Sequence, residues 1–568
     1  MTSAYRVRGT NAKAPFTLTI HRGDGMALLA MSWRNGRRPP RDFVGFGIQY
    51  RPPGATKALN VNNRLSFEGT PDFGKRRPSM KAPIQKFRWV HFPFDADRPG
   101  PFRYTVTPIF MDPDDHLRSG EAQEAEIELR RETYPGKLNV SFTRGFIASQ
   151  AFVDTFCRSE AELATLLPAR AADGLGFVPT HTRAAAALDW MGFEARRSIL
   201  DVLDEAIADP TTRVRIVAYD LSEPDVLSRM EQLGTRLRVI IDDSGSHEPA
   251  DSGESRSAVR LAASAGPANV ERQHMGNLQH NKTIVVSGPN LQKVVCGSTN
   301  FSWRGFFVQN NNAVVLNGET AVELFGDAFE HYWGGSAAGF RKSPSPEWSD
   351  LGLAGIDARV TFSPHSTSNA VLDSVADDIR AATSSVLYSL AFLYQTTGAV
   401  RDAVQAVTSD PAIFVAGISD RAVGGITVQT PDGNVAPVFP EALAQNVPAP
   451  FSEEIVGGSG IRMHHKFVVI DFDKPTARVY LGSYNFSSPA DNANGENLLL
   501  VADRRVATAY AIEAVRIFDH YQFRVRQRDE ATAVTTLALR KPPRTGELPW
   551  FDDDYTDANQ ILDRKLFA

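Results

Sequence analysis

The sequence predicts an α/β protein in which two similar α/β halves form a pseudo-dimer behind an N-terminal β-sandwich, an α+β arrangement overall. Three observations predict this. The 568 residues exceed what one hydrophobic core organises. The first part of the chain shows short alternating strands, and the rest repeats a helix and strand pattern with a period of about 180 residues. The expected segments are 1–145, 146–345, 346–545 and a tail, 546–568.

The first segment carries short apolar and aromatic runs separated by Gly, Pro and Asp. The runs FVGFGIQY, FRWVHF and FRYTVTPIF alternate in part with period two, which is typical of half-buried antiparallel strands. We therefore expect a small β-sandwich, with an immunoglobulin-like topology as one form of it. Its role is open between substrate presentation, control of access, partner binding and a purely structural function.

The rest of the chain shows the same order of elements twice. In the first copy, DVLDEAIADP, RVRIVAYD, PDVLSRMEQL and LRVIID predict helix, strand, helix and strand. In the second copy, NAVLDSVADDIRAATS, SVLYSLAFL, TGAVRDAVQAVTS and AIFVAGIS predict the same series. Such alternation predicts two α/β units whose strands are covered on both faces. The Pro-containing, acidic residues 546–568 are expected to form an extended tail.

Composition argues against several function classes. The net charge of -5 gives no overall basic footprint for nucleic acid. The two cysteines, Cys157 and Cys296, are too few for a disulfide framework or a thiolate metal site. No apolar run approaches the ~20 residues of a transmembrane helix, and the first residues lack the apolar region of a signal peptide. A soluble, cytoplasmic protein is therefore expected.

Two groups of basic residues near the N-terminus are local candidates for anion binding. Solvated loops are the favoured interpretation, and binding to phosphate or a membrane surface is the alternative. The first group contains Arg34, Arg37, Arg38 and Arg41, and the second contains Lys75, Arg76, Arg77 and Lys81.

Each copy of the repeat contains a His-x-Lys motif at the start of an expected strand. Because residues i and i+2 of a strand project to the same side, His280 lies beside Lys282, and His464 lies beside Lys466. An ammonium group neutralises a phosphate, while an imidazole attacks phosphorus or moves a proton near neutral pH. One such pair is weak evidence, since a lone histidine on a strand is more often structural.

The doubling of the motif changes this assessment, because each pair is followed by Gly-Ser-x-Asn with its hydroxyl, amide and backbone donors. If the halves face each other about a pseudo-twofold axis, two histidines and two lysines converge on one phosphate. The lysines then supply the charge stabilisation that other enzymes take from Mg²⁺, so neither a metal nor a cofactor is expected. The phosphate-binding candidates are Ser298, Asn300, Ser483 and Asn485.

The doubled pattern resembles the phospholipase D superfamily, whose signature is His-x-Lys-x4-Asp followed by Gly-Ser or Gly-Gly, x and Asn. The second copy matches in full, from His464 through Asp471 to Glu496. The first copy departs twice, with Ser287 at the Asp position and Asn311 at the position of Glu496. The resemblance implies that the first of these positions supports the fold, and that the second orients a catalytic imidazole.

The resemblance also implies an activity. His280 is the expected nucleophile and His464 the expected general acid and base, so that a phosphodiester is cleaved or transferred through a covalent phosphohistidine. Phospholipid is the first-choice substrate, which implies lipid degradation and peripheral contact with a membrane. A metal-independent nuclease acting on DNA or RNA is the alternative, and a catalytically silent binding protein is the second alternative. His465 is expected to be structural or to face solvent, since it alternates with its neighbour.

Overall fold

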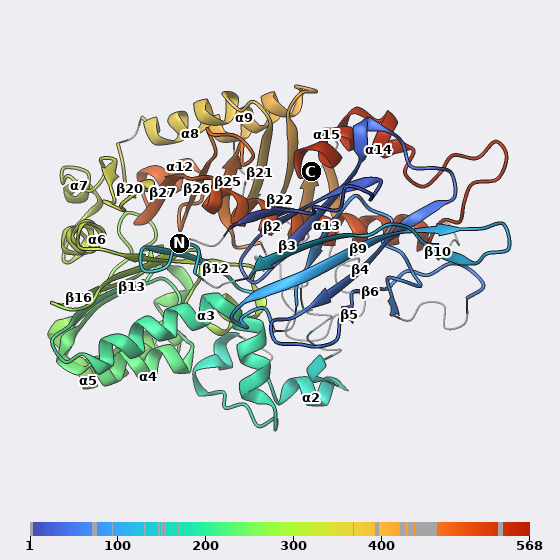
Figure 1. The fold of residues 1–568 in the computed structure, drawn as a ribbon. Helices are drawn as coiled ribbons and strands as arrows, with labels where there is room; N and C mark the ends of the chain where they lie inside the picture. Colours follow the sequence, from blue (N-terminus) through green and yellow to red (C-terminus); the bar gives the residue numbers. More distant parts are fainter. Residues whose placement is uncertain are drawn as a thin grey trace. The chain divides into compact units, whose positions relative to one another are not determined.

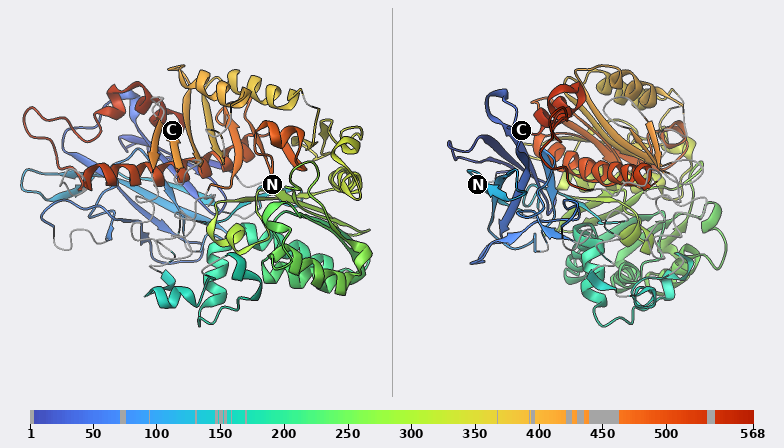
Figure 2. Two further views of the ribbon diagram at one scale, coloured as in Figure 1. Left: turned by 180° about the vertical axis from the view of Figure 1, so that it is seen from behind. Right: turned by 90° about the vertical axis from the view of Figure 1, so that its right-hand side faces the viewer.

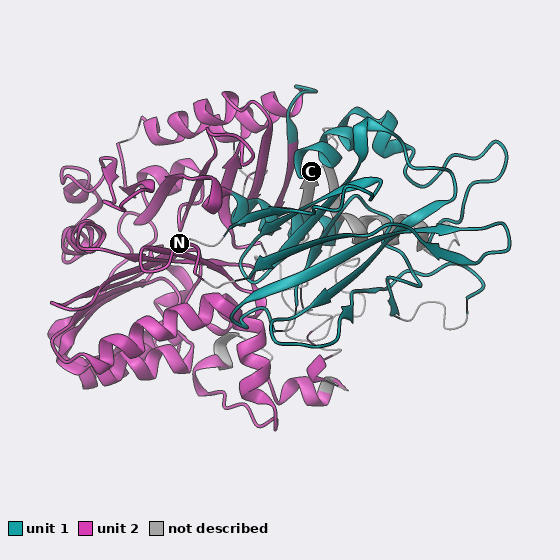
Figure 3. Cartoon of the chain, viewed as in Figure 1, with its two compact units in different colours: residues 1–131, 410–414, 508–568 teal, residues 132–409, 415–507 magenta. Residues whose placement is uncertain are grey.

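The chain folds into two compact units (Figure 3). Unit 1 comprises residues 1–131, 410–414 and 508–568, and unit 2 comprises residues 132–409 and 415–507. The computed structural model describes residues 4–70, 76–93, 95–129, 132–145, 148, 152, 155–157, 159–168, 171–366, 368–391, 393, 397–420, 426–429, 435–438, 463–531 and 538–568.

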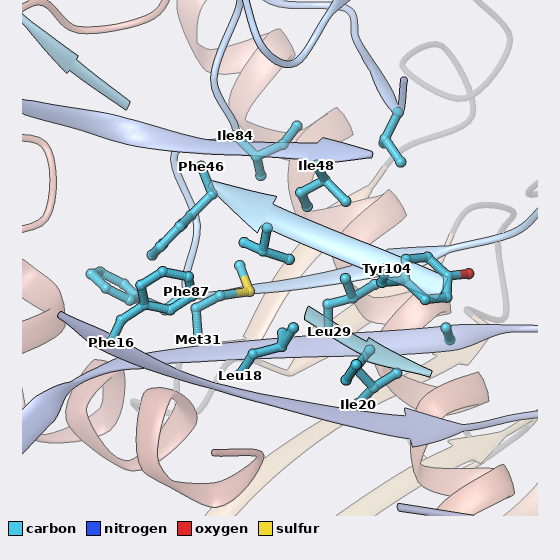
Figure 4. Packing of buried hydrophobic residues seen from close by; sticks show 14 of the residues in the cluster. Phe16, Leu18, Ile20, Leu29, Met31, Phe46, Ile48, Ile84, Phe87 and Tyr104 are labelled. Carbon is cyan, nitrogen blue, oxygen red and sulfur yellow. The ribbon is translucent and has the colours of Figure 1, made fainter. Parts of the chain in front are cut away.

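Unit 1 contains the expected β-sandwich. One sheet has the order β1-β2-β3-β8, and the other has the order β10-β9-β4-β5 with β11 also paired to β9. Alternate side chains of these strands fill the space between the sheets, such as Leu18 and Ile20 from one sheet and Phe46 and Ile48 from the other (Figure 4). The strands are β1 (Arg6–Arg8), β2 (Phe16–Arg22), β3 (Ala27–Trp33), β4 (Phe43–Arg51), β5 (Leu59–Asn60), β8 (Arg88–His91), β9 (Pro101–Met111), β10 (Leu117–Ser119) and β11 (Gln123–Glu128).

The C-terminal residues complete unit 1. They include most of α13 (Arg504–Ala531) together with α14 (Asp553–Thr556) and α15 (Ala558–Leu566). Phe551 belongs to the sandwich core, and buried Arg88 forms ion pairs with Asp519 and Asp563 at 2.5 Å. Residues 546–568 therefore differ from the extended tail that we expected. The prediction of a tail was based on their acidic composition. It gave no weight to the few aromatic residues of this segment, which pack into the core of the N-terminal sheets.

Unit 2 contains two sheets with a shared strand order. The seven-stranded sheet runs β12-β18-β17-β16-β13-β14-β15, and the nine-stranded sheet runs β19-β20-β27-β26-β25-β21-β22-β23-β24. The run from β12 to β14 corresponds strand for strand to the run from β20 to β22. The predicted pair of α/β halves is therefore confirmed.

The strands of the first half are β12 (Leu138–Phe142), β13 (Arg213–Ala218), β14 (Leu237–Ile241), β15 (Val270–Arg272), β16 (Lys282–Ser287), β17 (Gln292–Gly297) and β18 (Asn312–Asn317). Those of the second half are β19 (Ser349–Asp350), β20 (Asp357–Ser363), β21 (Ser385–Leu390), β22 (Phe414–Asp420), β23 (Ile426–Gln429), β24 (Val435–Val438), β25 (Lys466–Ile470), β26 (Arg478–Gly482) and β27 (Glu496–Ala502).

Helices cover the outer sides of these two sheets. Figures 1 and 2 show α3 (Ala184–Ala208), α4 (Pro224–Leu233) and α5 (Gly253–Ala265) along the first sheet, and α8 (Ala370–Arg380) and α9 (Ala399–Thr408) along the second. Each helix buries an apolar stripe, as α8 does with Val371, Val375 and Ile379. Across the described part of the chain, none of the helices has both the length and the apolar character that a bilayer span requires.

The first half begins earlier than the expected boundary at residue 145. Strand β12, which we assigned to the sandwich, pairs antiparallel with β18, so that Leu138 faces Leu316. Its equivalent in the second half is β20, which pairs with β27. An apolar strand with period two fits either sheet, and only its pairing with a strand far along the chain decides between them.

Candidate active site

The two His-x-Lys motifs stand at the start of equivalent strands. Strand β16 begins at Lys282, which pairs with Ala218 of β13, and strand β25 begins at Lys466, which pairs with Leu390 of β21. In each sheet the other neighbour is the strand that ends in the Gly of Gly-Ser-x-Asn. The strand order therefore brings the motif and the following polar segment of each half to the same end of the sheet.

The two halves meet at these motifs with pseudo-twofold symmetry. Gln279, just before the first motif, forms a parallel bridge with Gly495 of the second half. Met463, just before the second motif, forms the same bridge with Asn310 of the first half. The predicted convergence of the two motifs thus has a backbone basis, because each motif is joined to the other half directly at its start.

The middle residue of each motif continues this symmetry. The side-chain amide of Asn497 donates to Oδ1 of Asn281 at 2.8 Å. In the related pair, Nδ2 of Asn312 lies 3.4 Å from Nδ1 of His465. His465 is completely buried, which confirms the structural interpretation of this residue and excludes the solvent-facing one. These contacts fasten the two halves on the side of the strands that faces away from the motif histidines.

His280 and His464 lie together in the interior. Their ring centroids are 6.2 Å apart with an angle of 67° between the planes, and their exposures are only 4% and 3%. Lys282 and Lys466 are also buried. Two imidazoles and two ammonium groups from the two halves therefore gather in one enclosed place, as the doubled motif predicted.

Each imidazole faces a residue of the opposite half, and of the two Nδ1 atoms only that of His464 forms a hydrogen bond within the described part of the chain. Nδ1 of His464 lies 2.8 Å from Oδ1 of Asn311 and 3.0 Å from the carbonyl oxygen of Ser298. Nδ1 of His280 lies 3.3 Å from Oε1 of Glu496. In a neutral His464 ring, Nδ1 carries the proton because it faces two carbonyl acceptors, and Nε2 is then the basic nitrogen.

The two orienting residues are themselves held in place. Oε1 of Glu496 accepts a hydrogen bond from Nδ2 of Asn494 at 2.7 Å, and Oε2 accepts one from the backbone N–H of Asn485 at 3.0 Å. Asn311 accepts from Oγ of Ser298 at 3.0 Å and donates through Nδ2 to the carbonyl oxygen of Gly305 at 2.9 Å. The carboxylate side of the asymmetric site is therefore the side of His280.

The lysines of the two motifs make equivalent contacts. Nζ of Lys282 donates to the carbonyl oxygen of His280 at 2.5 Å, and Nζ of Lys466 donates to that of His464 at 2.8 Å. Burial and the neighbouring Lys466 lower the pKa of Lys282. Burial and the two lysines also lower the pKa of both imidazoles.

Glu496 is the acidic group of this enclosure. Burial raises the pKa of Glu496 to about 7, although Asn494 and the two motif lysines pull it down. A charged carboxylate needs a partner when it is buried, and the lysines and the imidazole provide one only when they hold their protons. A negatively charged ligand in this enclosure would favour the protonated forms of the lysines and imidazoles.

The polar residues after each motif take two different positions. Ser298 and Ser483 are buried, and their Oγ atoms accept the backbone N–H of Asn312 and Asn497 at 3.0 Å. The amide of Asn300 donates to Oδ2 of Asp220 at 2.6 Å. The serines thus fasten the loop to the next strand, and Asn300 is turned toward a carboxylate that our sequence analysis did not single out.

Ser287 and Asp471 occupy equivalent positions at the ends of the strands that begin with the motif lysines: Ser287 is the last residue of β16, and Asp471 directly follows β25. Asp471 accepts hydrogen bonds from the backbone N–H groups of Thr383 and Ser384 at 2.7 to 3.0 Å. Oγ of Ser287 lies 3.5 Å from the carbonyl oxygen of Arg213. Both side chains contact the segment at the start of the neighbouring strand, which agrees with a role in the fold.

A group of side chains beside the first motif was missed by the sequence analysis. Tyr219 and Asp220 follow β13, Asp242 follows β14, and His247 lies just beyond. Their signal was present, since polar residues directly after buried strands often belong to sites at the ends of those strands. A single sequence gave no reason to prefer them over ordinary loop residues.

Among the described residues, two groups bring three possible metal ligands within 4.8 Å of one another: Asp112, Asp114 and His116 in unit 1, and Asp220, His247 and Glu254 in unit 2. In the second group, Nδ1 of His247 lies 2.8 Å from Oδ2 of Asp242, and Nε2 lies 3.3 Å from Oδ1 of Asp220.

Comparison with known families supports the assignment that the motifs suggested. The family model for the phospholipase D-like domain of cardiolipin synthase matches residues 203–333 and 377–518, which include both motifs. The chain belongs to the phospholipase D superfamily. Members of this superfamily are phosphodiesterases and transferases.

Several solved structures are similar to this phospholipase D-like chain. Phosphatidylserine synthase from Haemophilus influenzae has 12% identity and a TM-score of 0.41 over 58% of this chain and 85% of its own. Nuc, a phospholipase D family member from Salmonella typhimurium, has 25% identity and a TM-score of 0.21 over 25% of this chain and 87% of its own. Polyphosphate kinase from Porphyromonas gingivalis has 12% identity and a TM-score of 0.35 over 54% of this chain, and the match spans only 42% of the kinase. A search of curated proteins finds no match.

Proposed function

We propose that this chain cleaves or transfers a phosphodiester in two steps, through a covalent phosphohistidine on His280. His464 acts as general acid and then as general base. The observation that carries the proposal is the pair of buried imidazoles, 6.2 Å apart, each with its Nδ1 turned toward an acceptor of the opposite half. This arrangement leaves Nε2 of each ring for the reacting atoms.

In the first step, Nε2 of His280 forms a bond to phosphorus while the bond from phosphorus to the leaving oxygen breaks. Protonated His464 gives its proton to that oxygen. In the second step, neutral His464 takes a proton from water or an alcohol, whose oxygen attacks phosphorus and displaces His280. The histidines return to their first states at the end of the second step.

The asymmetric acceptors support this division of roles. A nucleophilic imidazole becomes positively charged as the N–P bond forms, and the carboxylate of Glu496 at 3.3 Å stabilises that charge. Asn311 orients His464 through a neutral amide, which stabilises an imidazolium less and so leaves it a stronger acid. His280 is thus suited to attack phosphorus, and His464 is suited to give up a proton.

The lysines support binding of the phosphate anion. Lys282 and Lys466 are buried beside the two histidines, where preorganised positive charge acts with little screening by water. A phosphodiester carries the negative charge that this enclosure needs in order to retain its protons. Substrate binding therefore also protonates the general acid that the first step requires.

Phospholipid is the substrate class that we propose first. The alternative, a nuclease, would use the N-terminal arginines to hold a nucleic-acid backbone. Arg34 donates to the carbonyl oxygen of Ala14 at 2.8 Å, and Arg38 forms an ion pair with Asp552 at 2.9 Å. Both arginines therefore bind groups within unit 1. This weakens the nuclease alternative, in which they would bind the phosphates of a nucleic acid. Lys75 of the second basic group lies outside the described residues, and a cytoplasmic location stays a prediction.

Two assays test the proposal. Cleavage of bis-p-nitrophenyl phosphate in the presence of EDTA tests the chemistry, with His280→Ala as the inactive control. Release of head group from phosphatidylcholine vesicles, compared with cleavage of single- and double-stranded DNA, tests the substrate class. DNA cleavage without lipid cleavage would select the nuclease alternative. No cleavage of any activated phosphodiester by the wild-type chain would select the catalytically silent protein.

A further inference from the structure

A buried histidine outside the two motifs lies beside the first of them. His247 ends the short turn η5 (Gly245–His247) and is 7% exposed. Its Nδ1 lies 2.8 Å from Oδ2 of Asp242, and its Nε2 lies 3.3 Å from Oδ1 of Asp220. An imidazole that donates from both nitrogens is an imidazolium. Burial lowers the pKa of His247, but the hydrogen bonds to Asp220 and Asp242 outweigh burial and raise it to about 10.

Both carboxylates that hold His247 also hold parts of the candidate active site. Oδ1 of Asp242 accepts the backbone N–H of Gln279, the residue just before the first motif, at 2.7 Å. Oδ2 of Asp220 accepts the side-chain amide of Asn300 at 2.6 Å. A cation between two carboxylates permits their close approach. His247 thereby joins the backbone of the first motif to the Gly-Ser-x-Asn segment that follows it.

Tyr219 connects His247 to the first motif by packing. The centroid of its ring lies 4.6 Å from the ring centroid of His247 and 4.7 Å from that of His280, and both pairs pack edge to face. Nζ of Lys282 lies 4.6 Å from the centroid of the same ring. One aromatic side chain thus contacts the buried imidazolium and both chemical groups of the motif.

This arrangement distinguishes the first half from the second. Ala218 pairs with the lysine of the first motif and Leu390 with that of the second, so Tyr219 and Ala391 occupy equivalent positions. A methyl group cannot bridge two rings as Tyr219 does. The supporting contacts therefore serve the half that contains the proposed nucleophile.

We propose that His247 is a positioning residue that orients His280 and sets its basicity. The inference rests on the proposed function, in which unprotonated His280 attacks phosphorus. Loss of the imidazolium leaves the charges of Asp220 and Asp242 without compensation near His280. Nearby negative charge makes an imidazole hold its proton more tightly. In the pH profile of kcat/KM, activity falls at acidic pH because the nucleophile becomes protonated. This acidic limb of the profile then moves to higher pH.

Other charged groups around His247 stay the same when it alone is replaced. Arg272 of β15 donates to the carbonyl oxygen of His247 at 2.7 Å, a contact with the backbone that a substitution leaves in place. Glu254 of α5 accepts the backbone N–H of Leu221 at 3.0 Å, and burial raises the pKa of Glu254. The groups that face His247 or its carboxylates are Asp220, Asp242, Glu254, Arg272, Lys282 and Arg304.

The first experiment measures kcat/KM for bis-p-nitrophenyl phosphate between pH 4.5 and 9 in the wild type and in His247→Gln. Glutamine keeps a hydrogen-bonding side chain and removes the charge. We expect the acidic limb to rise by about one pH unit, with about a tenfold loss of kcat/KM at neutral pH. The matched control is His365→Gln, because His365 is buried between Asp491 and Thr361, each at 2.7 Å, in the second half. This control should leave the limb where it is.

A second variant tests the sign of the effect and does not depend on whether His247→Gln folds. Asp242→Asn keeps an oxygen for the N–H of Gln279 and removes a negative charge, so the acidic limb should move to lower pH. Shifts of opposite sign support the inference. An active wild type whose limb moves in neither variant overturns it and leaves the proposed function standing. An inactive wild type overturns the proposed function itself.

Discussion

The two halves of unit 2 share strand order and motifs but differ in what surrounds each imidazole. His280 has the carboxylate of Glu496, the ring of Tyr219 and the His247 group around it. His464 has the amide of Asn311. The motif lysine and the Gly-Ser-x-Asn segment are present in both halves, whereas among the described residues a carboxylate, Tyr219 and His247 lie on the side of His280. This difference between the halves suits the two unlike roles that the proposed two-step reaction gives to the histidines.

The strongest test of this comparison removes one histidine at a time. His280→Ala should lose at least about 10⁴-fold in kcat, because both steps need the nucleophile. His464→Ala should still react with a substrate whose leaving group needs no proton and should then stall as a phosphoenzyme. Acid-labile, base-stable label on a peptide that contains His280 is the expected result. Label on His464 in the His280→Ala protein would reverse the assignment, and no label in any variant of an active enzyme would argue for direct attack by water.

Exchange of the acceptors should have the next largest effect. Glu496→Gln removes the charge that supports the nucleophile and should lower kcat/KM by about a hundredfold, in the range that removal of an orienting partner costs. Asn311→Asp should raise the pKa of His464 and move the basic limb of kcat/KM to higher pH, because the acid keeps its proton longer. If both variants lost kcat/KM equally and neither shifted a limb of its pH profile, the difference between Glu496 and Asn311 would have no catalytic role.

Anion binding should show a smaller effect that depends on pH. Burial lowers the pKa of His280, His464 and Lys282 in the free site, and a bound anion raises these values. Binding of vanadate therefore takes up protons, and its affinity should fall as pH rises, by at most about tenfold per pH unit for each proton. Calorimetry in buffers of different ionisation enthalpy measures this uptake. Affinity that is independent of pH, or that needs a divalent ion and is lost with EDTA, would contradict this account of the site.

The smallest effects are expected at the position where the first half has Ser287 and the second half has Asp471. Ser287→Asp should change kcat/KM by less than about tenfold, and a change above about a hundredfold would place the residue in the catalytic apparatus. Asp471→Asn should lower the free energy of unfolding by about 1 to 3 kcal/mol, since a buried acceptor loses its charge.

The loss in Asp471→Asn should depend on pH with a definite sign. Burial raises the pKa of Asp471, but hydrogen bonds from Thr383 and Ser384 outweigh it and lower the folded pKa below the ordinary value. The carboxylate therefore contributes stability above that ordinary value, and the contribution disappears as pH falls through the folded pKa. Denaturation at neutral and acidic pH measures the difference, which should be largest at neutral pH.

The sequence by itself determined the features that follow from local spacing. Period-two strands, the doubled series of helices and strands, and the placement of each histidine beside its lysine all depend on residues close together in the chain. The same kind of local pattern identified the family, because the His-x-Lys motif is followed by the Gly-Ser-x-Asn segment in both copies of the repeat. The burial of the four motif side chains followed from these elements once the halves faced each other.

Only the tertiary structure decided which distant residues meet. Spacing does not reveal that Glu496 faces His280 across the two halves, that His247 lies between Asp220 and Asp242, or that β12 pairs with β18. Each of these contacts joins segments far apart in the chain, and an apolar or polar pattern fits several partners equally well. Which partner is chosen depends on the packing of whole sheets and on the pseudo-twofold contact between them, and these are properties of the folded chain.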